Sequence, residues 1–422
     1  MEEELGRQEI VLGFGSEYVK VTLEENRILG IVKPKEQPGV KDQVRIVEET
    51  LTNPIGKPPL KELVTPTSRI AIIVNDLTRP TPSLALLTPV LRTLKECGLP
   101  DQNVTLIIGL GTHRPVTHEE KTQLIGEDVA KRYRCTNSVD DGFVALGRTS
   151  RGTLVELAKA VAHADLCICT GNVEFHYFAG YTGGAKAIMP GTASRDAVSH
   201  NHSFQLLPGA IAGKCEGNPV REDIEEAVDF LPNVFIVNAV LNERKEMVAC
   251  VAGDFRQAHR TACRVVDRMY KIRIEQRAKV VLASAGGFPK DINLYQAHKA
   301  LENAAHAVER GGSIVFVASC SEGLGNEVFA RWIREASDPK DILERFKGGF
   351  ELGGHKAAAI ARVVMMAKVF LVSSLDRSTA ESLYFVPSAS VQQAVDAALG
   401  QQGPDAKVLV MPFAGSTLPS AE

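Results

Sequence analysis

The sequence lacks several features that would place it in a specialised class of protein. None of its eight cysteines belongs to a CxxC pair, which argues against a zinc ribbon and against a thioredoxin-type redox motif. It has no apolar run of about 18 residues, the length that predicts a transmembrane helix. The net charge of −3 lacks the basic excess of a nucleic-acid-binding surface. We therefore expect neither a membrane nor a nucleic acid as a partner.

The first residues, MEEELGRQE, are acidic and lack the apolar stretch of a secretory signal. The cysteines are scattered, and several lie in apolar runs, as in LCICT. Free, buried thiols in a reducing cytoplasm are the expectation. A hydrophobic fraction of 44% and a charged fraction of 23% are typical of ordinary globular proteins. With 422 residues, the chain is too long for one hydrophobic core, so two domains are expected.

An alternation of apolar strands and helices dominates the sequence from residue 69 onwards. Such alternation predicts parallel sheets covered by helices on both faces. We predict an α/β fold with two domains, residues 1–270 and 271–422, each with a mostly parallel sheet flanked by helices, and an active site in the cleft between them. The expected strands are 69–76, 104–111, 165–170, 233–238, 279–286, 313–319, 368–374 and 407–412, after a hairpin within 8–22. The expected helices are 40–52, 118–132, 219–230, 254–271, 293–308, 354–366 and 389–399, with others near 325–347 and one after TRPTPS that carries the apolar positions 84, 87, 90, 91 and 94.

The stretch EFHYFAGYTGGAKAIMPGTASRDAVSHNH, residues 174–202, is the best candidate for a functional site. Its glycines, among them Gly183 and Gly184, permit a positive φ or the close approach of a ligand. Lys186 follows them at the start of a predicted short helix, where backbone N–H groups favour anions. The histidines in or near the stretch are His163, His176, His200 and His202.

Polar sequences follow the predicted strands at the ends where ligands bind to open α/β sheets. DLTRP, which holds Asp76, Thr78 and Arg79, follows the first strand, and GTHRP, which holds His113, follows the second. In the second domain, GGFP leads into NLYQAHKAL, with Tyr295, Gln296 and Lys299. Gln296 and Lys299 are three residues apart, so one helical face presents both.

Two site chemistries are compatible with these residues. His113, His176 and His202 could hold zinc and activate water, as in a hydrolase. Alternatively, two of the histidines act as acid and base, the third binds a metal-containing cofactor, and an arginine and a lysine clamp a carboxylate. Only the second chemistry uses the lysines and the glycines. A third alternative is a non-catalytic binder of a nucleotide or a carboxylate.

Several of these motifs together resemble the lactate racemase family of nickel-pincer-nucleotide enzymes. They are DLTRPTP, GTHRP, NLYQAHKAL and the spacing from His176 through Lys186 to His202. The resemblance implies a racemase or epimerase of a 2-hydroxy acid. Its cofactor would be a pyridinium-3,5-bisthiocarboxylate mononucleotide with nickel, covalently attached to Lys186 and supplied by cofactor-biosynthesis proteins.

The resemblance also implies roles for individual residues. His202 would be the nickel ligand, and His113 and His176 the alternating bases while hydride passes reversibly between the substrate and the cofactor. The remaining cofactor-binding residues would be Asp76, Thr78, Gly183 and Gly184. The substrate-binding residues would be Arg79, Tyr295, Gln296, Lys299 and His355.

One departure from the family pattern bears on the substrate. Lactate-specific members carry a tryptophan near the segment LGGHKAAAIAR, where this chain has Gly354-His355-Lys356. The single tryptophan, Trp332, lies elsewhere. His355 and Lys356 could face a second carboxylate or a hydroxyl, or cap a helix. We therefore expect a larger or more polar 2-hydroxy acid than lactate.

Overall fold

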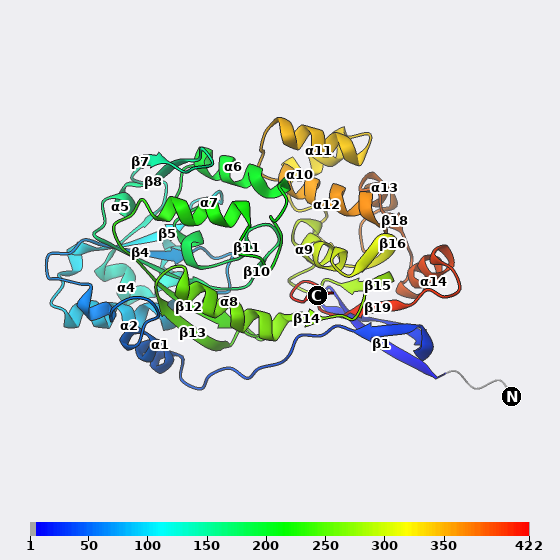
Figure 1. Ribbon diagram of the computed structural model, residues 1–422, viewed down its shortest axis with the longest axis horizontal. Helices are drawn as coiled ribbons and strands as arrows, with labels where there is room; N and C mark the ends of the chain where they lie inside the picture. Colours follow the sequence, from blue (N-terminus) through cyan, green and yellow to red (C-terminus); the bar gives the residue numbers. More distant parts are fainter. Residues whose placement is uncertain (1–5, 422) are drawn as a thin grey trace. The chain divides into compact units, whose positions relative to one another are not determined.

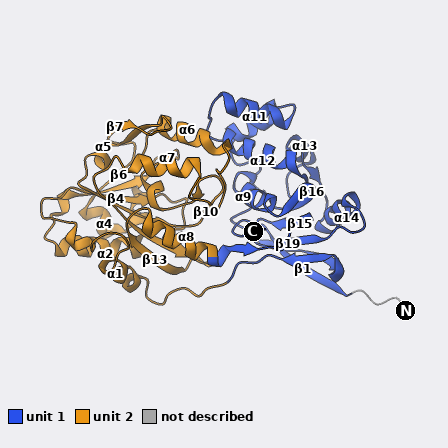
Figure 2. Ribbon diagram, viewed as in Figure 1, with its two compact units in different colours: residues 1–35, 268–422 blue, residues 36–267 orange. Residues whose placement is uncertain are grey.

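The computed structural model describes residues 6–421, which form two compact units. Unit 2 is Glu36–Asp267, and unit 1 combines the chain up to Lys35 with the chain from Arg268 onwards (Figure 2). The change of unit between Asp267 and Arg268 lies close to the predicted boundary at residue 270. The assignment of the N-terminal segment to the first domain was wrong, because that segment belongs to the unit formed by the C-terminal half.

Unit 2 is built on a six-stranded sheet in the order β13-β12-β9-β4-β5-β6. All neighbours are parallel except β13, which pairs antiparallel with β12 and was not predicted. The central strands are buried throughout, as expected of a sheet covered on both faces. The strands are β4 (Ile70–Asn75), β5 (Val104–Gly109), β6 (Arg134–Asn137), β9 (Leu166–Asn172), β12 (Val234–Leu241) and β13 (Met247–Gly253).

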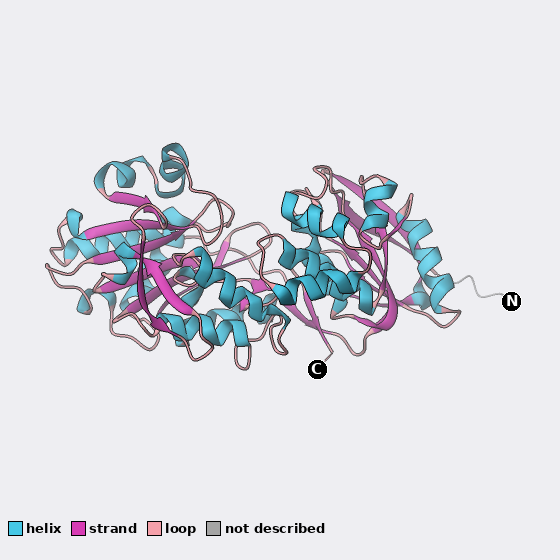
Figure 3. Ribbon diagram, turned by 90° about the horizontal axis from the view of Figure 1, so that it is seen from above, coloured by secondary structure: helices cyan, strands magenta, loops and turns pink. Residues whose placement is uncertain are grey.

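Helices flank this sheet, as Figures 1 and 3 show. Leu86, Leu87, Val90 and Leu94 of α2 share one hydrophobic core with residues of the central strands. The predicted helix 118–132 is two helices, because Gly126 between them has a φ of +82°. The helices are α1 (Gln43–Thr52), α2 (Ser83–Glu96), α3 (His118–Ile125), α4 (Glu127–Arg132), α5 (Lys159–Ala162), α6 (Arg195–Ser203), α7 (Pro219–Val228) and α8 (Gln257–Tyr270).

Short elements complete unit 2. An antiparallel ladder joins β7 (Phe143–Arg148) to β8 (Leu154–Ala158). A two-residue ladder joins β10 (Phe175–His176) to β11 (Gly180–Tyr181). The 3-10 helices are η2 (Leu60–Glu62), η3 (Asp101–Asn103), η4 (Gly184–Ala187) and η5 (Phe204–Leu206), with η1 (Glu25–Arg27) in unit 1.

Unit 1 contains a second six-stranded sheet, in the order β18-β17-β16-β15-β19-β3, in which every pair is parallel. Ile31 of β3 pairs with Val410 of β19, so the N-terminal segment supplies an edge strand to a sheet that the end of the chain completes. The strands are β3 (Ile28–Ile31), β15 (Ala278–Ser284), β16 (Val308–Val317), β17 (Lys368–Val372), β18 (Val386–Pro387) and β19 (Val408–Met411).

The predicted N-terminal hairpin forms from β1 (Arg7–Phe14) and β2 (Glu17–Glu24). Its apolar face, including Leu12 and Val21, shares a core with Val395 of α14 and the strands of unit 1. Strand β14 (Lys271–Arg273) pairs with β20 (Leu418–Ser420). The helices are α9 (Leu294–Ala305), α10 (Glu327–Glu335), α11 (Pro339–Gly348), α12 (Gly354–Met366), α13 (Arg377–Ser382) and α14 (Val391–Gln402). No helix within residues 6–421 is both long enough and apolar enough to cross a membrane.

A buried carboxylate fastens the hairpin turn to the sheet of unit 1. Asp291 is fully buried, and its Oδ2 accepts hydrogen bonds from Gly15 N at 2.7 Å and Ser319 N at 3.0 Å. Gly15 lies in the turn between β1 and β2, and Ser319 follows β16. Asp291 therefore ties the N-terminal hairpin to the carboxyl end of a central strand.

We predict that Asp291→Ala lowers the free energy of unfolding of unit 1 by about 3 kcal/mol, because two buried N–H groups lose a charged acceptor. Urea unfolding followed by Trp332 fluorescence measures this, since the only tryptophan lies in the same unit. Asp396→Ala, a change at an exposed carboxylate, is the control, with an expected effect within about 0.5 kcal/mol. Equal midpoints for the two variants would contradict the assigned role.

Candidate active site

Three neighbouring strands of unit 2 bring the predicted site loops to one edge of the sheet. The order β9-β4-β5 places the loops after Asn172, Asn75 and Gly109 side by side, and Asn75 pairs with Gly109 at the last register position. Thr81 links two of these strand ends: its hydroxyl donates to Asn172 Oδ1 at 2.8 Å and accepts from Asn75 Nδ2 at 2.8 Å. Side-chain hydrogen bonds therefore join the C-terminal ends of β4 and β9.

Asp76 and His113 form a hydrogen-bonded pair at this edge, with 2.5 Å between Asp76 Oδ2 and His113 Nδ1. Asp76 also accepts from the Thr78 hydroxyl at 2.7 Å and the Thr78 amide at 3.2 Å. Burial acts to raise the pKa of Asp76, but the hydrogen bonds from His113 and Thr78 outweigh it and hold that pKa below its usual value. The carboxylate fixes the Nδ1 proton of His113, so Nε2 carries the lone pair of the neutral ring. The pair is a histidine base oriented by a carboxylate. The sequence motifs had predicted Asp76 as a cofactor-binding residue and not as the partner of His113.

The segment before Lys186 is shaped by two glycines with positive φ, +73° at Gly183 and +59° at Gly184. A Cβ on Gly184 would lie 2.8 Å from the His259 ring, and one on Gly183 would lie 2.8 Å from Asn238 Oδ1. The Gly184 amide donates to the same Asn238 oxygen at 2.7 Å. The protein's own side chains thus require both glycines. Their role in binding a cofactor remains a prediction.

Lys186 lies in η4 and is buried, with 9% of its surface exposed. Burial, and then the positive charges of Arg221 and Arg79, shift the pKa of its amine well below the usual value. Arg221 is itself fully buried and donates to the carbonyl oxygens of Ala179 and Tyr181. The lowered pKa favours the neutral amine, the form that can act as a nucleophile.

Phe178 brings three of the predicted residues together. Its ring meets the ring of His176 edge-on at 4.5 Å between centroids and the ring of His202 at 4.9 Å. The Lys186 Nζ lies 5.7 Å from the same ring centroid. Phe178 is buried, and it was not among the predicted site residues. Two imidazoles and a neutral amine therefore surround one phenyl ring.

The hydrogen bonds of the two histidines at Phe178 set their tautomers. His176 Nδ1 accepts from the Ala179 amide at 3.2 Å, so in the neutral ring the proton is on Nε2. His202 lies on α6, and its Nδ1 is 3.1 Å from Asn201 Oδ1. Since an amide oxygen only accepts, Nδ1 of His202 carries the proton and Nε2 the lone pair. In the neutral rings, Nε2 of His176 can thus donate a hydrogen bond, and Nε2 of His202 can bind a metal ion.

The other two histidines in or near the central stretch, His200 and His163, are exposed to solvent. His200 is exposed, and its Nδ1 lies 2.8 Å from the Thr153 hydroxyl. His163 is exposed after α5. Within residues 6–421, the one group of three or more metal-ligating side chains that converge is Cys215, His259 and Cys263, and it contains none of the histidines of the predicted zinc-hydrolase site. The geometry thus gives the hydrolase alternative no metal centre.

Arg79 forms a loose ion pair with Glu174, with 3.7 Å between Arg79 Nη1 and Glu174 Oε1. The two side chains are 31% and 40% exposed, so the pair contributes little to stability. A weak, partly solvated ion pair allows the guanidinium to exchange Glu174 for another carboxylate. Its role in substrate binding remains a prediction.

The predicted substrate residues of unit 1 lie on α9 and α12. Gln296 and Lys299 are exposed on one face of α9, as their spacing predicted. Lys356 of α12 donates to the Tyr295 carbonyl oxygen at 2.6 Å, and its Nζ lies 3.4 Å from the centroid of the Tyr295 ring. His355 lies 6.4 Å from the same ring, between centroids. The start of α12 is therefore bound to the start of α9.

His355 is buried, and burial together with the charge of Lys356 lowers its pKa to about 3. Its Nδ1 accepts the Gly353 amide at 3.1 Å, so it helps to cap α12 and carries its proton on Nε2. A Cβ on Gly354 would lie 2.4 Å from the ring of Trp332, so this glycine makes room for the tryptophan. His355 can donate a hydrogen bond but carries no positive charge near neutral pH.

The arrangement in unit 2 is that of an enzyme site. It combines a carboxylate-oriented histidine, a second histidine suited to proton transfer, and a neutral buried lysine beside a third histidine. Such a set serves proton transfer next to a covalently held group better than it serves simple ligand binding.

Comparison with known proteins identifies the family. Residues 14–213 match the model of the lactate racemase N-terminal domain, and residues 274–417 match that of the C-terminal domain. The lactate racemase of Lactiplantibacillus plantarum is 32% identical over 376 residues, covering 87% of this chain and 88% of the relative. The lactate racemase of Thermoanaerobacterium thermosaccharolyticum is 30% identical over 415 residues, covering 96% and 97%. The chain belongs to the lactate racemase family, and the predicted enzyme class, an isomerase, is confirmed.

Solved structures agree with this assignment. The lactate racemase apoprotein from Thermoanaerobacterium thermosaccharolyticum matches with a TM-score of 0.91 at 29% identity, covering 98% of this chain and all of the other. A protein from Thermotoga maritima matches with a TM-score of 0.65 at 18% identity, covering 91% of this chain, and shows the fold alone. The predicted α/β fold with mostly parallel sheets is therefore confirmed.

We predict that Lys186→Met makes the unloaded protein more stable near neutral pH, by about 1–3 kcal/mol, because burial of the amine is unfavourable. The folded-state pKa of Lys186 lies below its unfolded value of 10.5, so the unfolded state binds more protons between the two. The wild type should therefore gain stability as pH rises towards 10.5, and the advantage of the variant should shrink. Urea unfolding across that pH range measures it.

Lys131→Met, at an exposed lysine, is the matched control and should show no such pH trend. A Lys186→Met variant that is less stable than the wild type at neutral pH would contradict the assignment of a neutral amine.

Proposed function

We propose that this protein racemises or epimerises a 2-hydroxy acid, using a nickel-pincer nucleotide attached covalently to Lys186. The observation that carries the proposal is the buried Lys186 amine beside the Phe178 ring that His176 and His202 also contact, in a member of the lactate racemase family. When bound, such a cofactor supplies a reversible hydride acceptor for the α-carbon of the substrate.

The residues present fit that group. An uncharged amine suits covalent attachment, and an imidazole that carries its lone pair on Nε2, as in His202, suits nickel. Arg221 has a buried Nη1 atom without a hydrogen-bond partner among residues 6–421. Its guanidinium charge acts on Lys186, so a bound anion near Lys186 would be stabilised by it. A phosphate-bearing nucleotide supplies that negative charge. We assign attachment to Lys186 and nickel ligation to His202, with Thr78, Gly183 and Gly184 as further cofactor contacts.

His113 and His176 are proposed to move the hydroxyl proton of the substrate. His113 accepts a proton at Nε2, and the Asp76 carboxylate stabilises the imidazolium that results. His176 differs, because its Nδ1 already accepts a hydrogen bond from the Ala179 amide. The two bases are thus unequal in the resting protein.

Arg79, Tyr295, Gln296 and Lys299 are proposed to hold the carboxylate and the hydroxyl group of the substrate. His355, neutral near pH 7, is proposed to donate to a hydroxyl or carbonyl group further along the molecule. A donor of that kind favours a larger or more polar 2-hydroxy acid over lactate. We also propose that cofactor-biosynthesis proteins supply the nucleotide and that the protein is cytoplasmic.

Lys186→Ala should abolish racemisation and prevent covalent loading. The test is a chiral assay of lactate and of larger, more polar 2-hydroxy acids, with intact mass, peptide mapping around Lys186 and nickel content measured on the same samples. Lys131→Ala, made with the cofactor pathway present, should retain activity, adduct and nickel. Racemisation by an unmodified Lys186 protein would end the proposal, and zinc-dependent hydrolysis of esters or amides by protein without nickel would favour a hydrolase instead.

Asp76→Asn should lower kcat/KM by about 10²- to 10⁴-fold, because the His113 imidazolium loses its carboxylate. Both reaction directions should fall by the same factor, since an enzyme does not alter the equilibrium constant. Initial rates from each stereoisomer measure this in fully loaded protein, with Asp128→Asn as the exposed control. An unchanged rate would remove His113 as a base, and substrate affinity without any turnover in loaded wild type would indicate a binder.

A further inference from the structure

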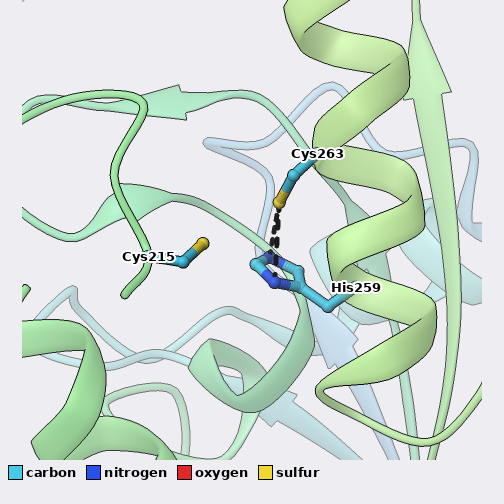
Figure 4. A group of neighbouring side chains, drawn as sticks. All are labelled: Cys215, His259 and Cys263. Carbon is cyan, nitrogen blue, oxygen red and sulfur yellow. Dashed lines mark hydrogen bonds between the residues drawn. The ribbon is translucent and has the colours of Figure 1, made fainter. Parts of the chain in front are cut away.

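A buried group of two thiols and an imidazole lies outside the residues assigned above. Cys215 is in the loop that precedes α7, whereas His259 and Cys263 lie one turn apart on α8 (Figure 4). Their exposed fractions are 5%, 0% and 4%. One donor atom from each lies within 4.8 Å of the other two. Soft sulfur and nitrogen donors therefore converge in the interior of unit 2.

The spacing of the donors suits a tetrahedral ion. Zn–S and Zn–N bonds of about 2.3 and 2.0–2.1 Å at a tetrahedral angle place sulfur and nitrogen about 3.6 Å apart. Cys263 Sγ lies 3.6 Å from His259 Nδ1. Cys215 Sγ lies within 4.8 Å of a donor atom of each of the other two residues. Without an ion, the protein thus already holds Cys263 Sγ and His259 Nδ1 near their bonding separation, with Cys215 close by.

His259 has the tautomer that a metal ligand needs. Its Nε2 donates to the Thr182 carbonyl oxygen at 2.8 Å, which leaves the lone pair on Nδ1, and Cys263 Sγ lies 3.6 Å from Nδ1 and 3.7 Å from Nε2. A backbone carbonyl on the far nitrogen is the usual support of a ligating imidazole. Arg260 Nη1 donates a hydrogen bond to the same Nδ1 at 3.1 Å, and this bond would break when an ion binds to Nδ1. Arg260 Nη1 would then still donate to Glu225 Oε1, which lies 2.7 Å away.

We propose that Cys215, His259 and Cys263 form a site for a soft divalent ion, zinc by preference. Thiolate and imidazole ligands favour zinc over hard cations. Binding replaces the two thiol protons with the ion, so two protons leave and no electron is transferred. Three protein ligands leave the fourth tetrahedral position to water.

The site would brace the segment that carries Lys186. His259 holds the Thr182 carbonyl oxygen and packs where a Cβ of Gly184 would be. An ion at His259 would therefore join α8 and the loop at Cys215 to the backbone just before η4. This role is separate from the nucleotide proposed at Lys186, and its test does not depend on activity.

The test is zinc uptake by the full-length protein, reduced, stripped with a chelator and dialysed against zinc alone. Elemental analysis should find one zinc per chain, counted separately from nickel. Cobalt in place of zinc should produce a thiolate-to-cobalt charge-transfer band. Cys263→Ser should lose both signals, whereas Cys250→Ser, at a buried cysteine outside the group, should keep them.

A second measurement needs no substitution. Zinc should protect Cys215 and Cys263 of the wild type from alkylation in partly denaturing urea, and should leave the labelling of Cys167 and Cys250 unchanged. The proposal is overturned if the reduced protein takes up no stoichiometric zinc, or if uptake persists in Cys263→Ser. A Cys215–Cys263 disulfide in protein that binds no zinc after reduction would overturn it in favour of a redox pair.

Discussion

The burial of the Lys186 amine is the constraint on which the surrounding structure depends. An amine in a protein interior is stable there mainly in its neutral form, and the guanidinium groups of Arg221 and Arg79 strengthen that preference. The backbone must therefore hold the lysine in place by other means than an ion pair. Gly183 and Gly184 provide the bend, and Asn238 and His259 fix it from β12 and α8. A reactive group is thus positioned by rigid neighbours.

The second constraint is the order of the strands. Because β9, β4 and β5 are adjacent and parallel, the loops after their carboxyl ends meet at one edge. That rule of α/β sheets allowed the sequence to predict which loops carry site residues. It also explains the Asp76–His113 pair, whose members are 37 residues apart in sequence but follow neighbouring strands. Sequence motifs locate such loops, whereas hydrogen-bond partners within them depend on side-chain directions.

What sequence reasoning missed shares a physical cause. Strand β3 has four residues, and β19, with which it pairs, lies near the other end of the chain, so no local pattern identifies it. Phe178 reads as an ordinary apolar residue, and its meeting with His176 and His202 exists only after folding. The absence of a CxxC pair argued only against a zinc ribbon and a thioredoxin-type motif, and it gave no sign that Cys215 and Cys263 converge from a loop and a helix. Periodicity reports local elements, whereas these features arise from long-range contacts.

The unequal surroundings of His113 and His176 have a mechanistic consequence for the proposed reaction. A racemase must use each base in both directions, so each must hold a proton at some point in the cycle. Nδ1 of His113 is hydrogen-bonded to Asp76, whereas Nδ1 of His176 accepts the Ala179 amide. In the proposed cycle, protonation of His176 at Nδ1 would require the short β10–β11 segment to release that nitrogen. Phe178 lies in that segment and contacts His202 and Lys186, so the proposed proton transfer at His176 would involve the residues of the proposed cofactor site.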